Sequence, residues 1–137
     1  FGSTYNQRKY CSESIPKDTE KKSEESVFDC DDSSFEYLLN TSKEIPLVVQ
    51  IYAKWCPPCQ RLAPVLEKSV KKENGEVRLA RVNIDHCPKI AAQLGVRQIP
   101  FVVGFKHGKQ ITSFVGAADE SAVDSFVHSV KEGILQK

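Results

Sequence analysis

The chain of 137 residues contains no methionine, one tryptophan and no apolar run long enough to cross a membrane. Its longest apolar stretches, residues 47–53 and 101–105, are strand-sized, whereas a membrane span needs about 20 residues. Strong net charge is also lacking, because 19 basic and 18 acidic residues leave only +1. The sequence therefore predicts a globular domain whose partners include neither a membrane nor a nucleic acid.

The cysteines are odd in number, so at least one of the five has no partner within a monomer. They are sparser than the disulfide framework of a small secreted domain. Only Cys56 and Cys59 are separated by just two residues, so we interpret these two as a reactive pair. Cys11 is expected in an exposed tail and Cys30 at the buried end of a strand. Cys87 precedes a proline at a helix start, and we expect a quiet thiol at the helix cap there; a regulatory or dimer-forming thiol with a lowered pKa is the alternative.

Residues 1–26 differ in composition from the rest of the chain. They hold few large aliphatic side chains and many Ser, Lys, Glu and Asp, so we expect a weakly ordered tail before one domain at 27–137. Residues 1–10 carry no acid, and residues 8–12 resemble the end of a mitochondrial presequence. Because position 1 is not methionine, we predict removal of an upstream segment and a mitochondrial location. For these residues a solvated tail is the favoured interpretation, and for the location the cytoplasm is the alternative.

Strand and helix patterns alternate along the domain. Strands are expected at residues 27–30, 47–53, 77–84, 101–105 and 110–115, and helices after a cap at Asp32 or Ser33, at 57–72, at 88–94 and after a cap at Asp119. Strands joined through helices pair in parallel, whereas the hairpin closed by His107-Gly108 is antiparallel. The predicted fold is α/β, with a mixed central sheet of about five strands flanked on both faces by about four helices.

The cysteine pair lies where a buried strand gives way to a helix, within Trp55-Cys56-Pro57-Pro58-Cys59. The carboxyl ends of strands are where α/β sheets place their sites. A sulfur at a helix N-terminus meets unpaired N–H groups and the positive end of the helix dipole, and both favour the nucleophilic thiolate. Cysteines three positions apart can close a disulfide, so this motif predicts thiol–disulfide exchange.

The ordered motifs of this chain resemble those of the thioredoxin family. They are Trp55–Cys59, Val82–Asp85, Gly95–Pro100, Lys106–Gly108 and Val115-Gly116, and the resemblance covers about residues 27–136. It implies the thioredoxin fold, with Cys56 as the exposed attacking thiol and Cys59 as the buried resolving thiol. It also implies a cis-proline at Pro100. The implied substrate-facing residues are Trp55, Pro57, Pro58, Ile99, Pro100 and Gly116.

Two positions depart from the family pattern. Pro57 stands where thioredoxins commonly have glycine, and the doubled proline resembles tryparedoxins. Because neither proline has an N–H, the Cys56 thiolate is left with the Cys59 N–H as its donor. Gln50 stands where the family commonly has a buried aspartate, and Gln50 can only hydrogen-bond or orient a water. We expect Gln50 and Arg81 to modulate the site, with Arg81 extending to solvent for want of a carboxylate partner.

The leading functional hypothesis is an enzyme that reduces protein disulfides through Cys56 and Cys59, without metal or cofactor. Its implied partners are disulfide-containing proteins and a recycling reductase or low-molecular-weight dithiol. A disulfide oxidase or isomerase is one alternative, since the residues between the cysteines tune the reduction potential. A binding or chaperone module is another. A zinc site on the pair with His86 and Cys87 is disfavoured, because a second paired motif is missing.

Overall fold

The computed structural model describes residues 26–134, while residues 1–25 and 135–137 lie outside the description. The described elements follow the predicted order: β1 Val27–Cys30, α1 Phe35–Thr41, β2 Leu47–Tyr52, α2 Pro57–Lys71, β3 Arg78–Asn83, α3 Pro88–Leu94, β4 Phe101–Lys106, β5 Lys109–Val115 and α4 Glu120–Glu132. The predicted tail at 1–26, including Cys11, falls outside the described residues except for Ser26. That domain boundary stays a prediction.

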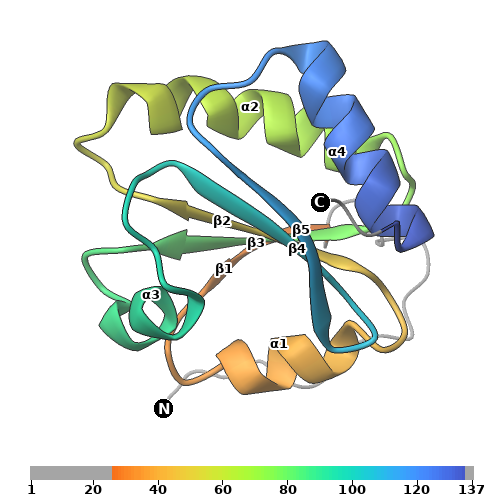
Figure 1. Cartoon of the computed structure of the whole chain (residues 1–137), viewed down its shortest axis with the longest axis horizontal. Helices are drawn as coiled ribbons and strands as arrows, with labels where there is room; N and C mark the ends of the chain where they lie inside the picture. The colour runs from red at the N-terminus through yellow and green to blue at the C-terminus, as the bar shows by residue number, and fades with distance from the viewer. Residues whose placement is uncertain (1–25, 135–137) are drawn as a thin grey trace.

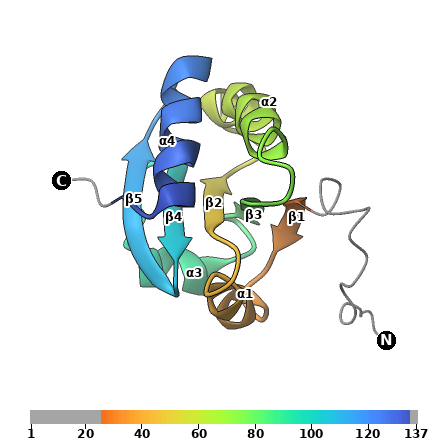
Figure 2. The same cartoon turned by 90° about the vertical axis from the view of Figure 1, so that its right-hand side faces the viewer.

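The strands form one five-stranded sheet in the order β1-β3-β2-β4-β5. The β1–β3 and β2–β3 pairs are parallel, whereas β4 is antiparallel to both β2 and β5. Helices α2 and α4 lie on one side of the sheet and α1 and α3 on the other (Figure 1), and a view turned by 90° shows the same layers (Figure 2). The predicted mixed α/β sheet is therefore confirmed.

A hydrophobic core lies on each face of the sheet. Along β2, Val49 and Ile51 pack into the cluster that contains α1 and α3 residues, whereas Val48 packs into the cluster that contains Leu62 and Leu66 of α2. This division explains the nearly continuous apolar run of β2, because a central strand covered on both faces buries every side chain. The strand that leads into α2 is thus held between a packed layer on each face of the sheet.

The loop after β1 corrects the predicted start of the first helix. Neither Asp32 nor Ser33 caps α1, because Ser34 occupies the N-cap position. The Asp31 carboxylate accepts the backbone N–H groups of Ser33 and Ser34 at 3.1 Å each. The turn that leads into α1 is therefore held by Asp31, the aspartate that precedes the two predicted candidates.

Asp32 caps a different helix, α3. Its carboxylate accepts the N–H groups of Lys89 at 3.2 Å and Ile90 at 3.0 Å. The first N–H groups of any helix need outside acceptors, and the side chain of the N-cap residue Cys87 makes no capping bond. The two adjacent aspartates thus serve two different helices, and Asp32 ties the β1–α1 loop to the segment that follows β3.

Candidate active site

Cys56 and Cys59 form a disulfide at the start of α2, with their Cα atoms 5.3 Å apart. Cys56 is the N-cap residue, and Pro57 and Pro58 follow as the first helical residues. Proline suits this position because its φ is helical and its missing N–H would be unpaired there in any case. The local sequence therefore places the Cys56 sulfur at the N-terminus of α2 and the Cys59 sulfur within the first helical turn.

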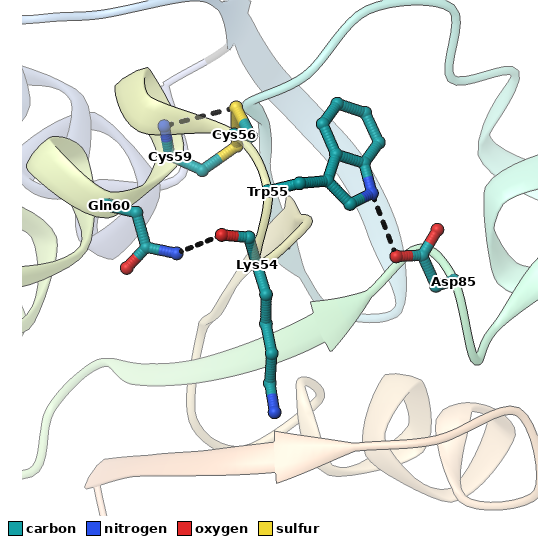
Figure 3. Close-up of a disulfide and its surroundings, with 6 residues drawn as sticks. All are labelled: Lys54, Trp55, Cys56, Cys59, Gln60 and Asp85. Atoms are coloured by element: carbon teal, nitrogen blue, oxygen red, sulfur yellow. Dashed lines mark hydrogen bonds between the residues drawn. A yellow bond between two sulfur atoms is a disulfide. The ribbon is translucent and has the colours of Figure 1, made fainter.

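The Cys56 sulfur receives one backbone hydrogen bond from within its own turn. The N–H of Cys59 donates to Cys56 Sγ at 3.3 Å (Figure 3). The predicted donor is thereby confirmed. An N–H aimed at this sulfur favours the thiolate after reduction, because a hydrogen bond to the charged form stabilises it.

The expectation that Cys56 is exposed is wrong for this disulfide form. Cys56 is 5% exposed and Cys59 is 1% exposed. Both pack with Ala53 in a small cluster bordered by Ile84 and Ile99, among others. The order of accessibility still follows the prediction, since Cys56 remains the more exposed of the two.

Trp55 projects beside the disulfide and is 67% exposed. Its indole Nε1–H donates to Asp85 Oδ2 at 3.0 Å, while on the other side of the loop Gln60 Nε2 donates to the Lys54 carbonyl at 2.9 Å (Figure 3). Two hydrogen bonds, one from the Trp55 side chain and one to the Lys54 carbonyl, thus hold the segment that precedes the cysteines. Sequence reasoning gave Asp85 no role, although its place directly after a parallel strand was the available signal.

The segment before β4 brings in a second part of the site. The Ile99–Pro100 peptide bond is cis. The Gly116 N–H donates to the Pro100 carbonyl at 2.8 Å, which joins this segment to the end of β5. Ile99 packs against the cysteine cluster, and Val115, which sequence reasoning missed, is 49% exposed at the end of β5. Ile99 therefore contacts the cysteine cluster directly, while a backbone hydrogen bond links the adjoining Pro100 to Gly116 at the end of β5.

Gln50 and Arg81 meet on neighbouring strands beneath this region. Gln50 is 0% exposed, and its Oε1 accepts a hydrogen bond from Arg81 Nε at 3.3 Å. The Arg81 guanidinium also lies over the Tyr52 ring, 4.3 Å from its centroid. Arg81 therefore does not simply extend to solvent as expected, because a buried amide oxygen and an aromatic face hold it.

Cys30 and Cys87 lie apart from the reactive pair, as free buried thiols. Burial raises the pKa of Cys30 to about 12. Burial, followed by the nearby Asp32 and Asp31 carboxylates, also raises the pKa of Cys87. The alternative of a lowered Cys87 pKa is therefore contradicted, because these effects outweigh the helix N-terminus, and the buried free thiol agrees with the quiet thiol that we expected. Within residues 26–134, no group of three or more His, Cys, Asp or Glu side chains is placed to hold a metal ion.

The profile of the thioredoxin family, described as "Thioredoxin", matches residues 26–129. The chain belongs to the thioredoxin family. It is 38% identical over 107 residues to the "Probable thioredoxin-2" of Caenorhabditis elegans, covering 77% of this chain and 72% of that protein. It is 40% identical over 86 residues to the mitochondrial thioredoxin of Mus musculus, covering 63% of this chain and 52% of that protein. Family and cysteine pair together support thiol–disulfide oxidoreductase activity.

Solved structures agree with this family assignment. The thioredoxin of Malassezia sympodialis, Mala s 13, superposes with a TM-score of 0.69 at 30% identity, covering 77% of this chain and 91% of the other. The predicted thioredoxin fold is therefore confirmed. The chain spans about half the length of several organellar relatives, which include chloroplast as well as mitochondrial thioredoxins. Among the described residues, no helix is long and apolar enough to cross a membrane.

Proposed function

We propose that this chain reduces disulfide bonds in proteins by dithiol–disulfide exchange through Cys56 and Cys59. The observation that carries this proposal is the helix N-cap position of Cys56, with the Cys59 N–H aimed at its sulfur. That geometry favours a thiolate at Cys56 and places a second thiol within reach to resolve the product.

The exchange proceeds in two steps. The Cys56 thiolate attacks one sulfur of the substrate disulfide, the substrate S–S bond breaks, and the departing thiolate takes a proton from solvent. Cys59, having released its proton to solvent, then attacks Cys56 Sγ in the mixed disulfide and expels the second substrate thiolate. Two electrons pass to the substrate and the chain is left with the Cys56–Cys59 disulfide. A reductase or a low-molecular-weight dithiol must therefore return two electrons in each cycle.

The substrate is proposed to lie as an extended segment across the residues around the disulfide. The proposed contact residues are Trp55, Pro57, Pro58, Ile99, Pro100 and Gly116. The large exposed area of Trp55 supports this assignment, since an exposed aromatic side chain beside a reactive group is typical of a contact surface. Val115 adds a second exposed apolar side chain, on a strand residue that pairs with Phe101 next to Pro100.

Replacing each cysteine separately tests the proposal. With dithiothreitol as electron donor and insulin disulfides as substrate, Cys56→Ser should abolish turnover. Cys59→Ser should abolish turnover and also accumulate a mixed disulfide on Cys56, detectable by mass spectrometry. Cys87→Ser, which changes a buried thiol outside the site, is the matched control and should remain active. Full activity in Cys56→Ser would overturn the proposed function.

An oxidase or isomerase is the second candidate, and the doubled proline between the cysteines favours it. A reduction potential near −270 mV supports a reductase, whereas one of about −120 to −180 mV supports an oxidant. A binding or chaperone role predicts instead that biological activity survives replacement of both Cys56 and Cys59 by serine.

We also propose a mitochondrial location, with the cytoplasm as the alternative. Support comes from the mitochondrial thioredoxins of mouse, rat and cattle among the relatives. Subcellular fractionation of the source cells, with an antibody against residues of the folded domain, tests this location. Recovery with chloroplast or cytoplasmic markers would contradict it.

A further inference from the structure

Gln50 holds a buried amide nitrogen that has no hydrogen-bond partner. The side chain is 0% exposed, and within residues 26–134 its Nε2 is the one buried side-chain nitrogen or oxygen atom left without a partner. Native proteins seldom leave such a donor unpaired, and each exception calls for a physical explanation such as a functional role.

The direction of this amide is fixed by Arg81. The Arg81 Nε–H donates to Gln50 Oε1 at 3.3 Å. Arginine has only donors, so the amide oxygen must be the atom that faces it. The NH₂ group of Gln50 therefore points away from Arg81, and its unpaired state is not the result of a reversed amide.

The position of Gln50 along β2 places its side chain on the face of the sheet that α2 covers. Val48, Gln50 and Tyr52 share one face of the sheet, because side chains alternate along a strand. Val48 packs with Leu62 and Leu66 of α2, and Tyr52 packs against the cluster that contains Cys56 and Cys59. Gln50 lies between them in this row, at the level where α2 carries its first turns.

We propose that Gln50 is a positioning residue, whose Nε2–H donates a hydrogen bond to the Cys59 thiolate once the disulfide has opened. The inference rests on the proposed function, because only exchange chemistry turns Cys59 into an anion. In the disulfide form the Cys59 sulfur is held by its bond to Cys56, and the amide nitrogen has no partner; the proposed bond therefore requires reduction to free the Cys59 sulfur to turn toward Nε2. After reduction the thiolate is a strong acceptor, and the unpaired donor gains its partner.

The two sulfurs would then have matched donors. Cys56 takes the Cys59 backbone N–H, because Pro57 and Pro58 offer none. Cys59, deeper in the helix, takes the side-chain N–H of Gln50. The donor matters in the second step, when Cys59 loses its proton to solvent and its thiolate displaces the substrate sulfur from Cys56. The titratable groups around this location are Tyr52, which borders the cysteine cluster, and the Arg81 cation over the Tyr52 ring.

The test measures the titration of Cys59 alone, in a Cys56→Ser background, by following its ¹³Cβ chemical shift against pH. Gln50→Met keeps the volume of the side chain and removes the donor, so the Cys59 pKa should rise by about one to two units. Gln50→Glu replaces the donor by a carboxylate and should raise that pKa at least as far, through like-charge repulsion. Val48→Ala, a core change in the same row, is the matched control and should leave it unmoved.

An unchanged Cys59 pKa in Gln50→Met would overturn the proposal, and so would an equal shift in Val48→Ala. An unchanged pKa in Gln50→Met is expected if a buried water, and not Cys59, accepts the hydrogen bond from the Gln50 amide. Because this titration needs no substrate, its failure is distinct from failure of the proposed function, which Cys56→Ser turnover decides.

A measurement on the reduced protein without any Gln50 variant keeps the proposal testable if those variants do not fold. One of the two side-chain amide proton signals of Gln50 should move with the same pH midpoint as Cys59. The proposal would be overturned if the chemical shifts of both Gln50 side-chain amide protons stayed constant through the pH range in which Cys59 titrates.

Discussion

Trp55 and Asp85 are joined by a hydrogen bond of 3.0 Å between the indole Nε1 and carboxylate Oδ2, across 30 positions of sequence. Trp55 directly precedes Cys56, and Asp85 follows β3. Because the indole is 67% exposed, packing alone does little to orient it. The bond therefore sets the direction of the largest apolar surface beside the disulfide.

Replacing Asp85 by alanine should weaken substrate binding more than it weakens folding. Loss of a hydrogen bond worth about 0.5–1.5 kcal/mol corresponds to a KM for insulin disulfides raised about two- to tenfold, with kcat nearly unchanged. Since Trp55 is the single tryptophan, its fluorescence reports the same change. Asp85→Asn keeps a carbonyl acceptor and should lie closer to wild type. Unaltered KM and emission in Asp85→Ala would contradict the role assigned to this bond.

Asp32→Ala should destabilise the start of α3. The carboxylate accepts two N–H groups, from Lys89 and Ile90, and loss of a capping side chain costs about 1 kcal/mol. Chemical denaturation measures the loss, and hydrogen exchange should become faster at those two amides. Asp29→Ala, which removes an exposed carboxylate from β1, is the control. Equal losses of stability in the two variants would show that capping is not the cause.

Gly104→Ala should destabilise the contact between β4 and α4. A Cβ at position 104 would overlap Cγ2 of Val130, and overpacking of this kind costs about 1–3 kcal/mol. Adding Val130→Ala removes the obstructing methyl groups, so the double variant should be more stable than the sum of the two single losses implies. Strict additivity in a denaturation cycle would mean that the two residues do not interfere.

Much of the fold could be predicted because local patterns and long-range packing agree. Residues of β2 such as Val48 and Val49 are apolar on alternate faces, as a central strand requires. Gly95, with φ of +67°, ends α3, and the Asp119 carboxylate accepts the Ala122 N–H at the start of α4. Each of these signals acts within a few residues, so the sequence alone displays it.

The features that could not be predicted depend on contacts between distant segments. A capping pattern shows that Asp32 can accept N–H groups, but not that it serves a helix 57 positions further along the chain. The sequence shows that Arg81 lacks a carboxylate partner at position 50. The contacts that Arg81 makes instead, with Gln50 and Tyr52, depend on the register of β2 and β3. The burial of Cys56 likewise follows from packing against Ile84 and Ile99.

Cys30 and Cys87 should resist alkylation in the native reduced protein. They are 6% and 1% exposed, and the pKa of each is raised, chiefly by burial. Both therefore remain protonated thiols at neutral pH, and the thiol is not the nucleophile. Iodoacetamide labelling resolved by mass spectrometry should modify Cys56 first and reach Cys30 and Cys87 only after denaturant is added. Labelling of native Cys87 as fast as Cys56 would contradict this prediction and favour the alternative of a regulatory thiol.

The same burial predicts how stability depends on alkaline pH. The pKa of Cys30 rises from 9.0 to about 12 on folding, so the folded state favours the neutral thiol. Its stabilising contribution is complete below pH 9.0, where Cys30 is protonated in both states, and is lost as the pH rises toward 12 because the unfolded chain ionises first. Cys30→Ala removes this titration, so its free energy of unfolding should fall less steeply above pH 9.0 than that of the wild type. Parallel curves for the two proteins would mean that Cys30 titrates alike in both states.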